Sequence, residues 1–379
     1  MVWKLGVFFV LNRSHRRKKM PDLTLLIVVF ALLFIGVVMV YSSSAIWSSY
    51  KFEDPFFYAK RQLLFAVIGL IAMYFMMNIP YQKWREYSNL ILIICFVLLI
   101  AVLIPGIGLE RNGAKSWIGI GAFSIQPSEF MKIGLIIFMA KILSDNQKYI
   151  TTFKQGFLPA MLLVFVPFGL IMLQPDLGTG MVLVGTCFVM IFIAGGKISH
   201  FMGLGMIGVI GFIGLVLSAP YRISRIQAFL NPWEDPLGDG FQIIQSLYAI
   251  GPGGLMGMGL GQSLQKFFYL PEPQNDFIFA ILAEELGFIG GSFVILLFFL
   301  LMWRGIRIAL GAQDLFGSLL ALGIIGMIII QVFINISVVI GLIPVTGITL
   351  PFISYGGSSL TLTLLSMGIL LNISRYAKI

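Results

Sequence analysis

Residues that build disulfides and metal centres are scarce in this sequence. It contains only two cysteines and two histidines among its 379 residues. Cys95 and Cys187 each lie within an apolar stretch, so we expect both to be buried and predict no disulfide. No group of histidines, cysteines and acids has the spacing that a metal cage requires. The sequence therefore predicts neither a disulfide-stabilised domain nor a metal site built by the chain alone.

Charge is also scarce, because most of the chain is apolar. Charged residues make up 11% of the sequence and hydrophobic residues 59%, a composition that excludes a soluble globular protein of this length. The apolar runs occupy residues 23–41, 63–77, 90–104, 130–143, 158–173, 179–194, 201–217, 277–302, 315–340 and 359–371. Several are shorter than the ~20 residues that cross a bilayer, so their flanks must extend them. We predict an all-α polytopic membrane protein with ten transmembrane helices.

Acidic residues are the scarcer charge, and the two signs are distributed unevenly between the loops. With ten crossings, 16 of the 25 Lys and Arg residues fall on the side of the termini, while 12 of the 16 acids fall on the other side. The positive-inside rule then makes both termini cytoplasmic. The net charge of +9 is thus a topology signal, and nucleic acid is not an expected partner. The basic residues at 13–19 are expected near the headgroups of membrane lipids.

The predicted topology divides the chain into three parts. They are a basic cytoplasmic segment at residues 1–22, a membrane domain at residues 23–373 and a short cytoplasmic tail at residues 374–379. A large extracellular loop, residues 220–276, lies between the seventh and eighth helices. Within it, residues 241–248 have apolar residues at helical spacing, which predicts a short helix along the membrane surface.

Five ionisable residues lie at or just inside the outer boundary of the predicted helices, where charge is costly and commonly functional. Glu129 and Lys132 are spaced i, i+3 at the start of the fourth helix, so they can pair on one face. Asp176 lies in the tight turn between the fifth and sixth helices, and Asp276 ends the long loop. Glu285 follows inside the eighth helix. Side chains from three hairpins can therefore meet at the outer end of one bundle.

Each of these residues also has an ordinary structural explanation. Asp276 can cap the eighth helix, Asp176 can bind the amides of its turn, and Glu129 can complement a helix dipole. Glu129 and Lys132 can form a buried ion pair whose role is structural. The pattern alone leaves both explanations open, although buried charge in a membrane rarely serves stability alone. The glycine-rich residues 257–261 follow no strand, so we do not interpret them as a nucleotide-binding loop.

Four motifs in the outer segments resemble those of one protein family. They are QPSE at 126–129, QPDLG at 174–178, DFIFA at 276–280 and PVTGITLPFISYGG at 344–357. They are similar to the FtsW/RodA/SpoVE family, and the resemblance extends from about residue 21 to residue 376. It implies a peptidoglycan glycosyltransferase in the cytoplasmic membrane of a bacterium. Such an enzyme polymerises lipid II into β-1,4 glycan strands on the outer face of that membrane.

The resemblance also implies roles for single residues, and Asp276 matches the carboxylate that the family uses in catalysis. A carboxylate near an apolar boundary is a suitable general base, because loss of hydration raises its pKa. Direct displacement with one base predicts an inverting enzyme. Lys132 is expected to bind the leaving pyrophosphate, with Glu129 orienting it. Further candidates for substrate binding or support are Gln126, Asp176, Lys115, Trp117, Arg222, Arg225, Lys266 and Glu285.

The leaving pyrophosphate needs positive charge, which a divalent cation, Mg or Mn, could also supply. One or two carboxylates and the phosphates of the substrate would hold that ion. The expected partner follows from the resemblance. The family's usual partner is a class B penicillin-binding protein, a transpeptidase with one membrane span. The long loop resembles FtsW and SpoVE more than RodA. The short tail favours spore cortex synthesis, at the forespore membrane, over cell division at the division site.

Two other functions are compatible with the sequence at this point. A lipid II flippase would line a passage through the membrane with charge, whereas the ionisable residues here cluster at the outer end of the helices. A non-enzymatic membrane scaffold that recruits the transpeptidase is the second alternative. Nothing in the sequence forbids that role alongside catalysis.

Overall fold

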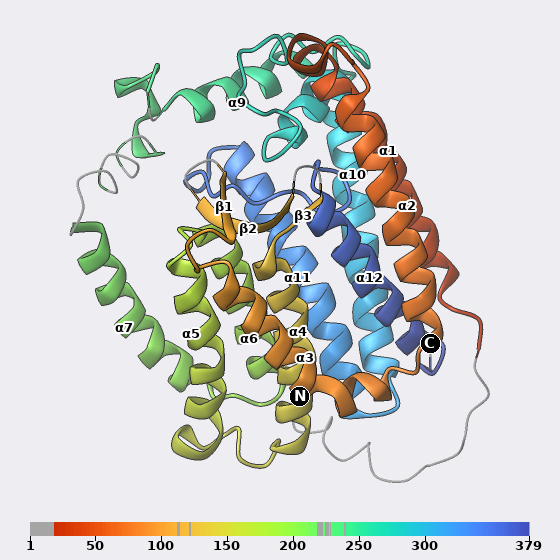
Figure 1. Ribbon diagram of the computed structural model, residues 1–379, viewed down its shortest axis with the longest axis vertical. Coiled ribbons are helices and arrows are strands. Elements are labelled where there is room, and N and C mark those ends of the chain that lie inside the picture. Colours follow the sequence, from red (N-terminus) through yellow and green to blue (C-terminus); the bar gives the residue numbers. More distant parts are fainter. Residues whose placement is uncertain are drawn as a thin grey trace.

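The structure is a computed structural model that describes residues 19–378 except for 112–113, 121–122, 218–222, 224–226, 228 and 239. Long helices packed side by side in a bundle make up most of the molecule (Figure 1). These helices are α1 (Leu23–Phe52), α2 (Phe57–Asn78), α3 (Gln82–Ala101), α4 (Pro127–Asp145), α5 (Leu158–Met172), α6 (Leu177–Ile193), α7 (Ile198–Leu217), α10 (Ile278–Gly311), α11 (Leu315–Val339) and α12 (Gly357–Ser374). A short π-helical turn, η2 (Phe153–Phe157), leads directly into α5.

Each apolar run predicted from the sequence falls on one of these helices. Among the described residues, seven helical segments are long and apolar enough to cross a bilayer, by length and composition. They are α1, α2, α3, η2 with α5, α10, α11 and α12. Helix α6 is apolar but shorter. The predicted multi-pass helical membrane protein is therefore confirmed in its general form.

The core of the bundle lies around α11 and α12. Their most apolar windows are 61% and 78% buried, compared with 22% for α2 and α3. Helices α2 and α3 instead leave large apolar side chains exposed on one face, among them Ile71, Phe75 and Ile93. Apolar side chains on both the inner and the outer faces are expected where the surroundings of the bundle are lipid.

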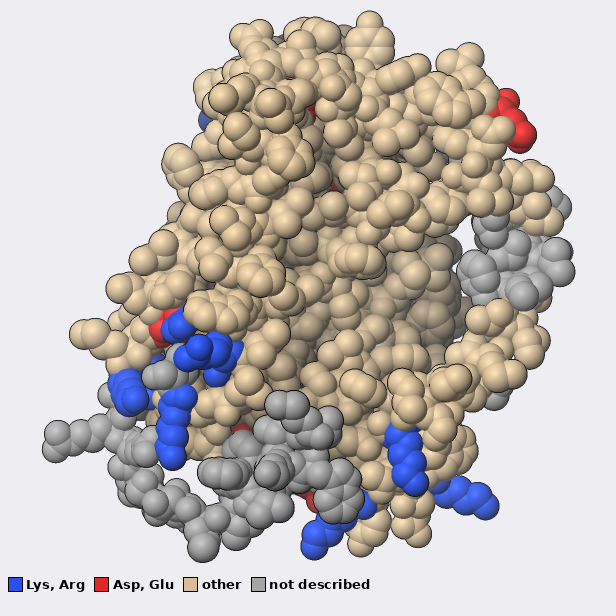
Figure 2. All heavy atoms as spheres, turned by 180° about the vertical axis from the view of Figure 1, so that it is seen from behind, with Lys and Arg blue, Asp and Glu red and all other residues tan. Residues whose placement is uncertain are grey.

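The two ends of the described chain lie together at one end of the bundle. The Lys19 amide donates to the Arg375 carbonyl at 3.1 Å, and the Asp22 amide donates to Ser374 Oγ at 3.0 Å. Asp22 also caps α1 and forms an ion pair with Arg304 of α10. Figure 2 shows several Lys and Arg side chains gathered at this end, next to a wide uncharged belt. This distribution agrees with the charge asymmetry read from the sequence.

The prediction of an all-α protein is wrong in one segment, because the long loop between α3 and α4 folds into a small antiparallel sheet. Strands β1 (Gly108–Arg111), β2 (Ala114–Ile120) and β3 (Phe123–Ile125) pair in the order β1-β2-β3. Leu109 lies opposite Trp117 in this sheet, and Ile118 lies opposite Ile125. Backbone N–H and C=O groups need hydrogen-bond partners, and in this loop the three short strands provide them for one another. The sheet rests on the start of α4 and lies beside the site described below (Figure 1).

Helix α10 is broken at Gly287, whose φ of 68° and ψ of −166° are not helical. The glycine-rich part of the long loop fills the break, because its backbone pairs with the groups that the break leaves free. The bonds run from Met258 N to Glu284 O, Gly259 N to Glu285 O and Phe288 N to Gly254 O, at 2.9 to 3.0 Å. A broken membrane helix is tolerated where other protein groups satisfy its backbone. The glycine-rich residues 257–261 thus have a structural role.

The short helix predicted in the long loop exists as α9 (Phe241–Gly253), and Figure 1 shows it lying across one end of the bundle. The apolar residues that predicted this helix do not all face the bundle. Ile244 is buried, but Leu247 and Tyr248 are exposed. The face that packs against the bundle carries Ser246, whose hydroxyl donates to the Val339 carbonyl of α11 at 2.7 Å. Helix packing, rather than a membrane surface alone, therefore sets the orientation of α9.

Candidate active site

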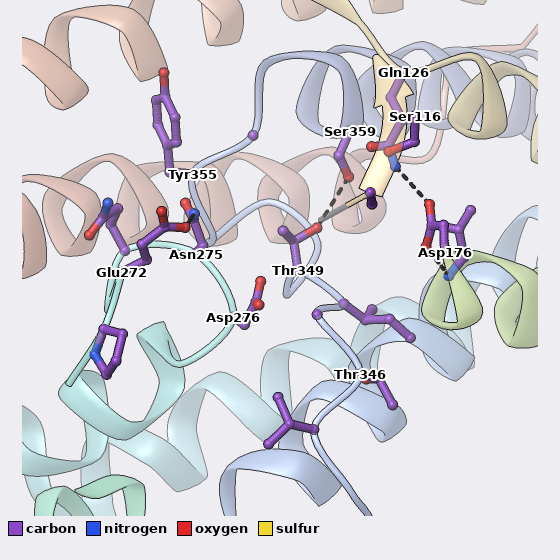
Figure 3. Close-up of a pocket in the computed structure, with 18 of the residues that line it drawn as sticks. Ser116, Gln126, Asp176, Glu272, Asn275, Asp276, Thr346, Thr349, Tyr355 and Ser359 are labelled. Atoms are coloured by element: carbon purple, nitrogen blue, oxygen red, sulfur yellow. Dashed lines mark hydrogen bonds between the residues drawn. The ribbon is translucent and has the colours of Figure 1, made fainter. Parts of the chain in front are cut away.

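A cavity of about 1080 Å³ lies at the end of the bundle away from the chain ends. Its position follows from its walls, which include the end of α1 at Phe52 and the start of α2 at Tyr58, whereas α1 begins at the opposite end. The other walls include the β2–β3 sheet, the start of α4, the α5–α6 turn, the start of α9, Gln331 of α11, the end of the long loop and the loop between α11 and α12. Segments that are distant in the sequence thus enclose one space (Figure 3).

The cavity brings together six of the residues predicted from the sequence: Trp117, Gln126, Glu129, Lys132, Asp176 and Asp276. Three others lie in the described part of the chain but do not line this cavity: Lys115, Lys266 and Glu285. The remaining two, Arg222 and Arg225, lie outside the described residues. The prediction that outer-end side chains from several hairpins converge therefore holds for the first group.

Asp276 is held at the cavity by its backbone. It ends the long loop just before α10, and its carbonyl accepts a hydrogen bond from Asn335 Nδ2 of α11 at 2.7 Å. The same Nδ2 donates to the Ile348 carbonyl at 2.7 Å, so Asn335 joins the long loop to the loop after α11. Asn335 is 1% exposed, and a buried amide that binds two carbonyls fixes their separation.

The carboxylate of Asp276 differs from the other acids at the cavity in having no hydrogen-bond or ion-pair partner in the described part of the chain. Among the described residues, no hydrogen bond or ion pair reaches either of its oxygens, and Figure 3 shows it between Glu272 and Thr346. The surrounding protein raises the pKa of Asp276 to about 6, and repulsion from Glu272 contributes to this rise. Burial disfavours the charged form, as does a nearby like charge. An unpaired carboxylate with such a pKa is suited to accept a proton near neutral pH.

Asp176 also lines the cavity, but both of its oxygens are engaged. It caps α6 by accepting a hydrogen bond from the Thr179 amide at 3.0 Å. Its other oxygen accepts a hydrogen bond from Gln126 Nε2 at 2.9 Å (Figure 3). These bonds tie the α5–α6 turn to the segment that precedes α4. Asp176 therefore holds the cavity wall, and it is a weaker candidate for a base than Asp276.

Glu129 and Lys132 form the ion pair that their spacing predicted. Lys132 Nζ lies 2.7 Å from Glu129 Oε1, and the two side chains are 2% and 10% exposed. Both line the cavity, in the first turns of α4. Burying such a pair costs desolvation free energy, which the attraction between the two charges must offset. This part of the cavity therefore carries both charges and no net charge.

Two cations at the cavity were missed by the sequence reasoning. Lys51 lies in the last turn of α1 and Arg61 in the first turns of α2, and both line the cavity. Both lie against aromatic rings: the Arg61 guanidinium is 4.1 Å from the Phe57 ring centre, and the Lys51 ammonium lies over Trp47. Within the described part of the chain, neither has a carboxylate at ion-pair distance. The sequence contained a signal for them, since Lys51, Lys60 and Arg61 are bases in a loop that the positive-inside rule predicts to be extracellular.

Lys266 and Glu285 form a buried pair away from the cavity. Lys266 Nζ lies 3.0 Å from Glu285 Oε1, and the Glu285 carboxylate also accepts a hydrogen bond from Ser42 of α1. The neighbouring Glu284 accepts hydrogen bonds from Ser263 Oγ at 2.5 Å and from the Leu264 amide at 2.8 Å. These contacts attach the long loop to α10 and α1. Lys266 and Glu285 therefore support the site indirectly, because they position the loop that ends at Asp276.

Comparison with known proteins identifies the family of the chain. A family model described as "Cell cycle protein", covering FtsW, RodA and SpoVE, matches residues 23–379. The chain belongs to this family. It is 69% identical to "Stage V sporulation protein E" of Bacillus subtilis (strain 168), over 96% of this chain and 99% of that protein. It is 47% identical to "Probable peptidoglycan glycosyltransferase FtsW" of Trichlorobacter lovleyi, over 94% of each chain.

Solved structures of the family have the same fold. A chain from the study "Structural coordination of polymerization and crosslinking by a peptidoglycan synthase complex" matches with a TM-score of 0.77 and 32% identity, over 94% of this chain and 98% of that one. Rod shape determining protein RodA of Thermus thermophilus matches with a TM-score of 0.70 and 28% identity, over 95% of this chain and 98% of that one. The resemblance read from the four motifs is therefore confirmed over nearly the whole chain.

Proposed function

We propose that this protein is a peptidoglycan glycosyltransferase that polymerises lipid II into β-1,4 glycan strands at the outer face of the cytoplasmic membrane. The family membership and the names of its relatives support the activity. The observation that carries the assignment of the site is the unpaired carboxylate of Asp276, with a raised pKa, in a cavity large enough for sugars.

The proposed reaction needs one proton acceptor. The 4-hydroxyl of one lipid-linked disaccharide attacks the anomeric carbon of the other, the bond from that carbon to the pyrophosphate oxygen breaks, and a new glycosidic bond forms. Asp276 takes the hydroxyl proton as the attack proceeds. A single direct displacement inverts the anomeric configuration, so an α-linked pyrophosphate gives a β bond. No second carboxylate is required, because no water is activated.

The leaving pyrophosphate requires positive charge, and the cations that line the cavity differ in whether a carboxylate already neutralises them. Lys132 was the expected cation, but Glu129 already neutralises it at 2.7 Å. Lys51 and Arg61 line the same cavity without a carboxylate partner in the described residues, so they are the better-placed cations for phosphate oxygens. We propose that they share this role and that Lys132 contributes through its pair.

A divalent cation remains part of the proposal in a limited form. Within the described chain, no group of three or more His, Cys, Asp and Glu residues could hold a metal ion. Asp276 and Glu272 line the cavity as a pair of carboxylates. Such a pair fits Mg²⁺ or Mn²⁺ only if phosphate oxygens and waters complete the coordination. When bound there, the ion would supply charge to the leaving pyrophosphate.

We propose ten crossings with both termini cytoplasmic, which leaves the cavity facing outward. The contact of Lys19 with Arg375 supports an even number of crossings. Cysteine labelling of intact cells, on a background without Cys95 and Cys187, tests the orientation. An impermeant maleimide should label Leu237→Cys and not Thr152→Cys, both of which replace exposed residues. Labelling of Thr152→Cys alone would reverse the assigned sides.

We also propose that the protein works together with a transpeptidase. The structural neighbour from a study of polymerisation and crosslinking in a peptidoglycan synthase complex supports a class B penicillin-binding protein as partner. The 69% identical sporulation protein supports a role in spore cortex synthesis, and the FtsW relatives support one in division. Deletion in a spore-forming host separates these roles, because loss of cortex with normal division supports sporulation, while filamentous growth supports division.

One assay separates the proposed activity from its alternatives. Purified protein is reconstituted in liposomes with fluorescent lipid II and no other polymerase. Glycan ladders on a gel support the glycosyltransferase. Transfer of lipid II across the bilayer without ladders would support the flippase, and neither result would support the scaffold. A purified class B penicillin-binding protein is added in a parallel sample, so that a need for the partner is not mistaken for inactivity.

A further inference from the structure

The inner part of the cavity contains polar groups that neither the pyrophosphate nor the base explains. Gln331 lies on α11 and is 3% exposed, yet its side-chain oxygen has no hydrogen-bond partner among the described contacts. Thr346, in the loop after α11, has a buried hydroxyl that is likewise unpartnered. Both residues line the cavity. Gln274 Oε1 and Asn275 Oδ1, in the loop before Asp276, are also buried at this cavity without a partner in the described part of the chain. Buried polar groups are nearly always hydrogen-bonded, so such groups in one cavity require an explanation.

The position of Gln331 relative to Asp276 follows from helix geometry. Asn335 binds the Asp276 carbonyl at 2.7 Å, and Gln331 is four residues earlier on the same helix. About one helical turn separates the two residues. Gln331 therefore lies ~6 Å further than Asn335 from the outer end of α11. A group attached to a sugar whose hydroxyl faces Asp276 can reach that depth.

The charge of this region excludes an anion as its preferred occupant. The ionised groups of α4 that line the cavity are Glu129 and Lys132, which neutralise each other. The Asp276 carboxylate lies beside the loop that carries Thr346, since a Cβ on Gly347 would lie 3.7 Å from Asp276 Oδ2. Gln331 and Thr346 are uncharged, and apolar Val182 and Ile348 line the same cavity. A region with one amide, one hydroxyl, apolar side chains and a neighbouring carboxylate matches a neutral polar ligand with an apolar end. The Asp276 carboxylate would repel a phosphate bound beside Thr346.

We propose that Gln331 and Thr346 form a subsite for a secondary amide of the substrate. This inference rests on the proposed glycosyltransferase function. The amide carbonyl of Gln331 accepts the N–H of the ligand, and the Thr346 hydroxyl donates to the ligand's carbonyl. The apolar side chains contact the adjacent methyl or methylene group. Two parts of a lipid-linked disaccharide peptide carry this chemistry: the acetamido group of a 2-acetamido sugar and the amides of the peptide stem.

The function of such a subsite is selection. A site with buried hydrogen-bonding groups rejects an analogue that lacks the matching groups, because its own polar atoms then stay unpaired. The subsite would therefore distinguish an N-acetylated sugar, or a peptide-bearing one, from an analogue with a hydroxyl in its place. It would also set the depth at which the sugar binds and so bring its 4-hydroxyl towards Asp276.

The test uses purified full-length protein and three lipid-linked disaccharides: the natural substrate, an analogue with a 2-hydroxyl in place of the acetamido group on the acceptor sugar, and one without the peptide stem. We expect the wild type to prefer the natural substrate by about tenfold or more in kcat/KM over one analogue, the size of one to two hydrogen bonds. Gln331→Met should reduce that preference to within about threefold and leave the rate on the disfavoured analogue nearly unchanged.

The choice of analogue identifies the ligand group. If Gln331→Met abolishes the preference over the 2-hydroxyl analogue, the acetamido group occupies the subsite, and if it abolishes the preference over the stemless analogue, the peptide does. Equal losses by Gln331→Met on all three substrates would overturn the proposal, as would a wild type that prefers none of them. Complete absence of ladders from the wild type with the natural substrate would instead refute the glycosyltransferase function itself.

Two further variants keep the test independent of folding. Thr346→Val removes the hydroxyl with little change of shape, and it should reduce the same preference by about threefold or more. Ser337→Ala is the matched control, because Ser337 is buried on the same helix but does not line the cavity. It should leave every preference unchanged. If Gln331→Met does not fold, an unchanged preference in Thr346→Val would overturn the proposal.

Discussion

The raised pKa of Asp276 makes a quantitative prediction about the pH dependence of polymerisation. A base with a pKa of about 6 is ~90% ionised at pH 7 and ~10% ionised at pH 5. If the ionised carboxylate accepts the proton, kcat/KM for glycan synthesis should fall about tenfold between pH 7 and pH 5, with its midpoint near pH 6. The assay is the initial rate of ladder formation from subsaturating fluorescent lipid II.

The causes of the raised pKa of Asp276 suggest a second test, in which a neighbouring charge is removed. Burial is the larger cause and repulsion from Glu272 the smaller one. Glu272→Gln removes the repulsion, so the midpoint should move to lower pH. Glu234→Gln is the control, because Glu234 is in the same long loop but does not line the cavity. A rate that does not change between pH 5 and pH 7, or a midpoint that rises in Glu272→Gln, would refute the reasoning.

Protein stability should respond to pH in the opposite sense to the rate. The folded pKa of Asp276 lies above its ordinary value of 3.8, so the folded state binds more protons than the unfolded state between about pH 4 and pH 6. The contribution of Asp276 to stability is therefore largest below this window and is lost as pH rises through it. Asp276→Asn removes this contribution. The Tm of the variant relative to the wild type should thus increase from pH 4.5 to pH 7.

Three further predictions follow from single contacts. Removing one charge of the Glu129–Lys132 pair should cost about 3 kcal/mol or more of stability, and recovery of Tm and activity by the double swap would mean that the pair is only structural. Asn335→Leu should lower kcat more than it raises KM, because it releases the Asp276 carbonyl; equal rates and an unchanged pH midpoint would contradict this. Gly287→Ala should lower Tm, since a Cβ would lie 2.3 Å from a backbone nitrogen of the long loop; an unchanged Tm would contradict the packing.

The helical framework could be predicted because membrane-spanning segments differ from their loops in composition. Long apolar runs such as 315–340 have no other stable placement, and each run falls on a helix. The break in α10 could not be predicted. Gly287 lies in an apolar helix where glycine is common, and only the packing of the glycine-rich loop against it explains the break.

The candidate site was predicted in part. Asp276, Asp176 and the Glu129–Lys132 pair could be found because ionisable residues at a membrane boundary stand out from their surroundings. The spacing of Glu129 and Lys132 predicted that they pair. It did not predict that the pairing leaves this part of the cavity without net charge. Gln331 and Asn335 were missed, because uncharged amides inside an apolar run resemble ordinary interhelical contacts. The sheet was missed because its strands have only three to seven residues.

The central claim is that Asp276 is the catalytic base of a glycosyltransferase, and one paired measurement tests it most directly. Wild type and Asp276→Asn are purified with equal yield and Tm, and ladder formation from lipid II is compared at pH 7. Asn keeps the size of the side chain but cannot accept the proton, so the rate should fall at least about a hundredfold. Ladders from Asp276→Asn at a rate near that of the wild type would contradict the claim and direct attention to Asp176 or Glu129 instead.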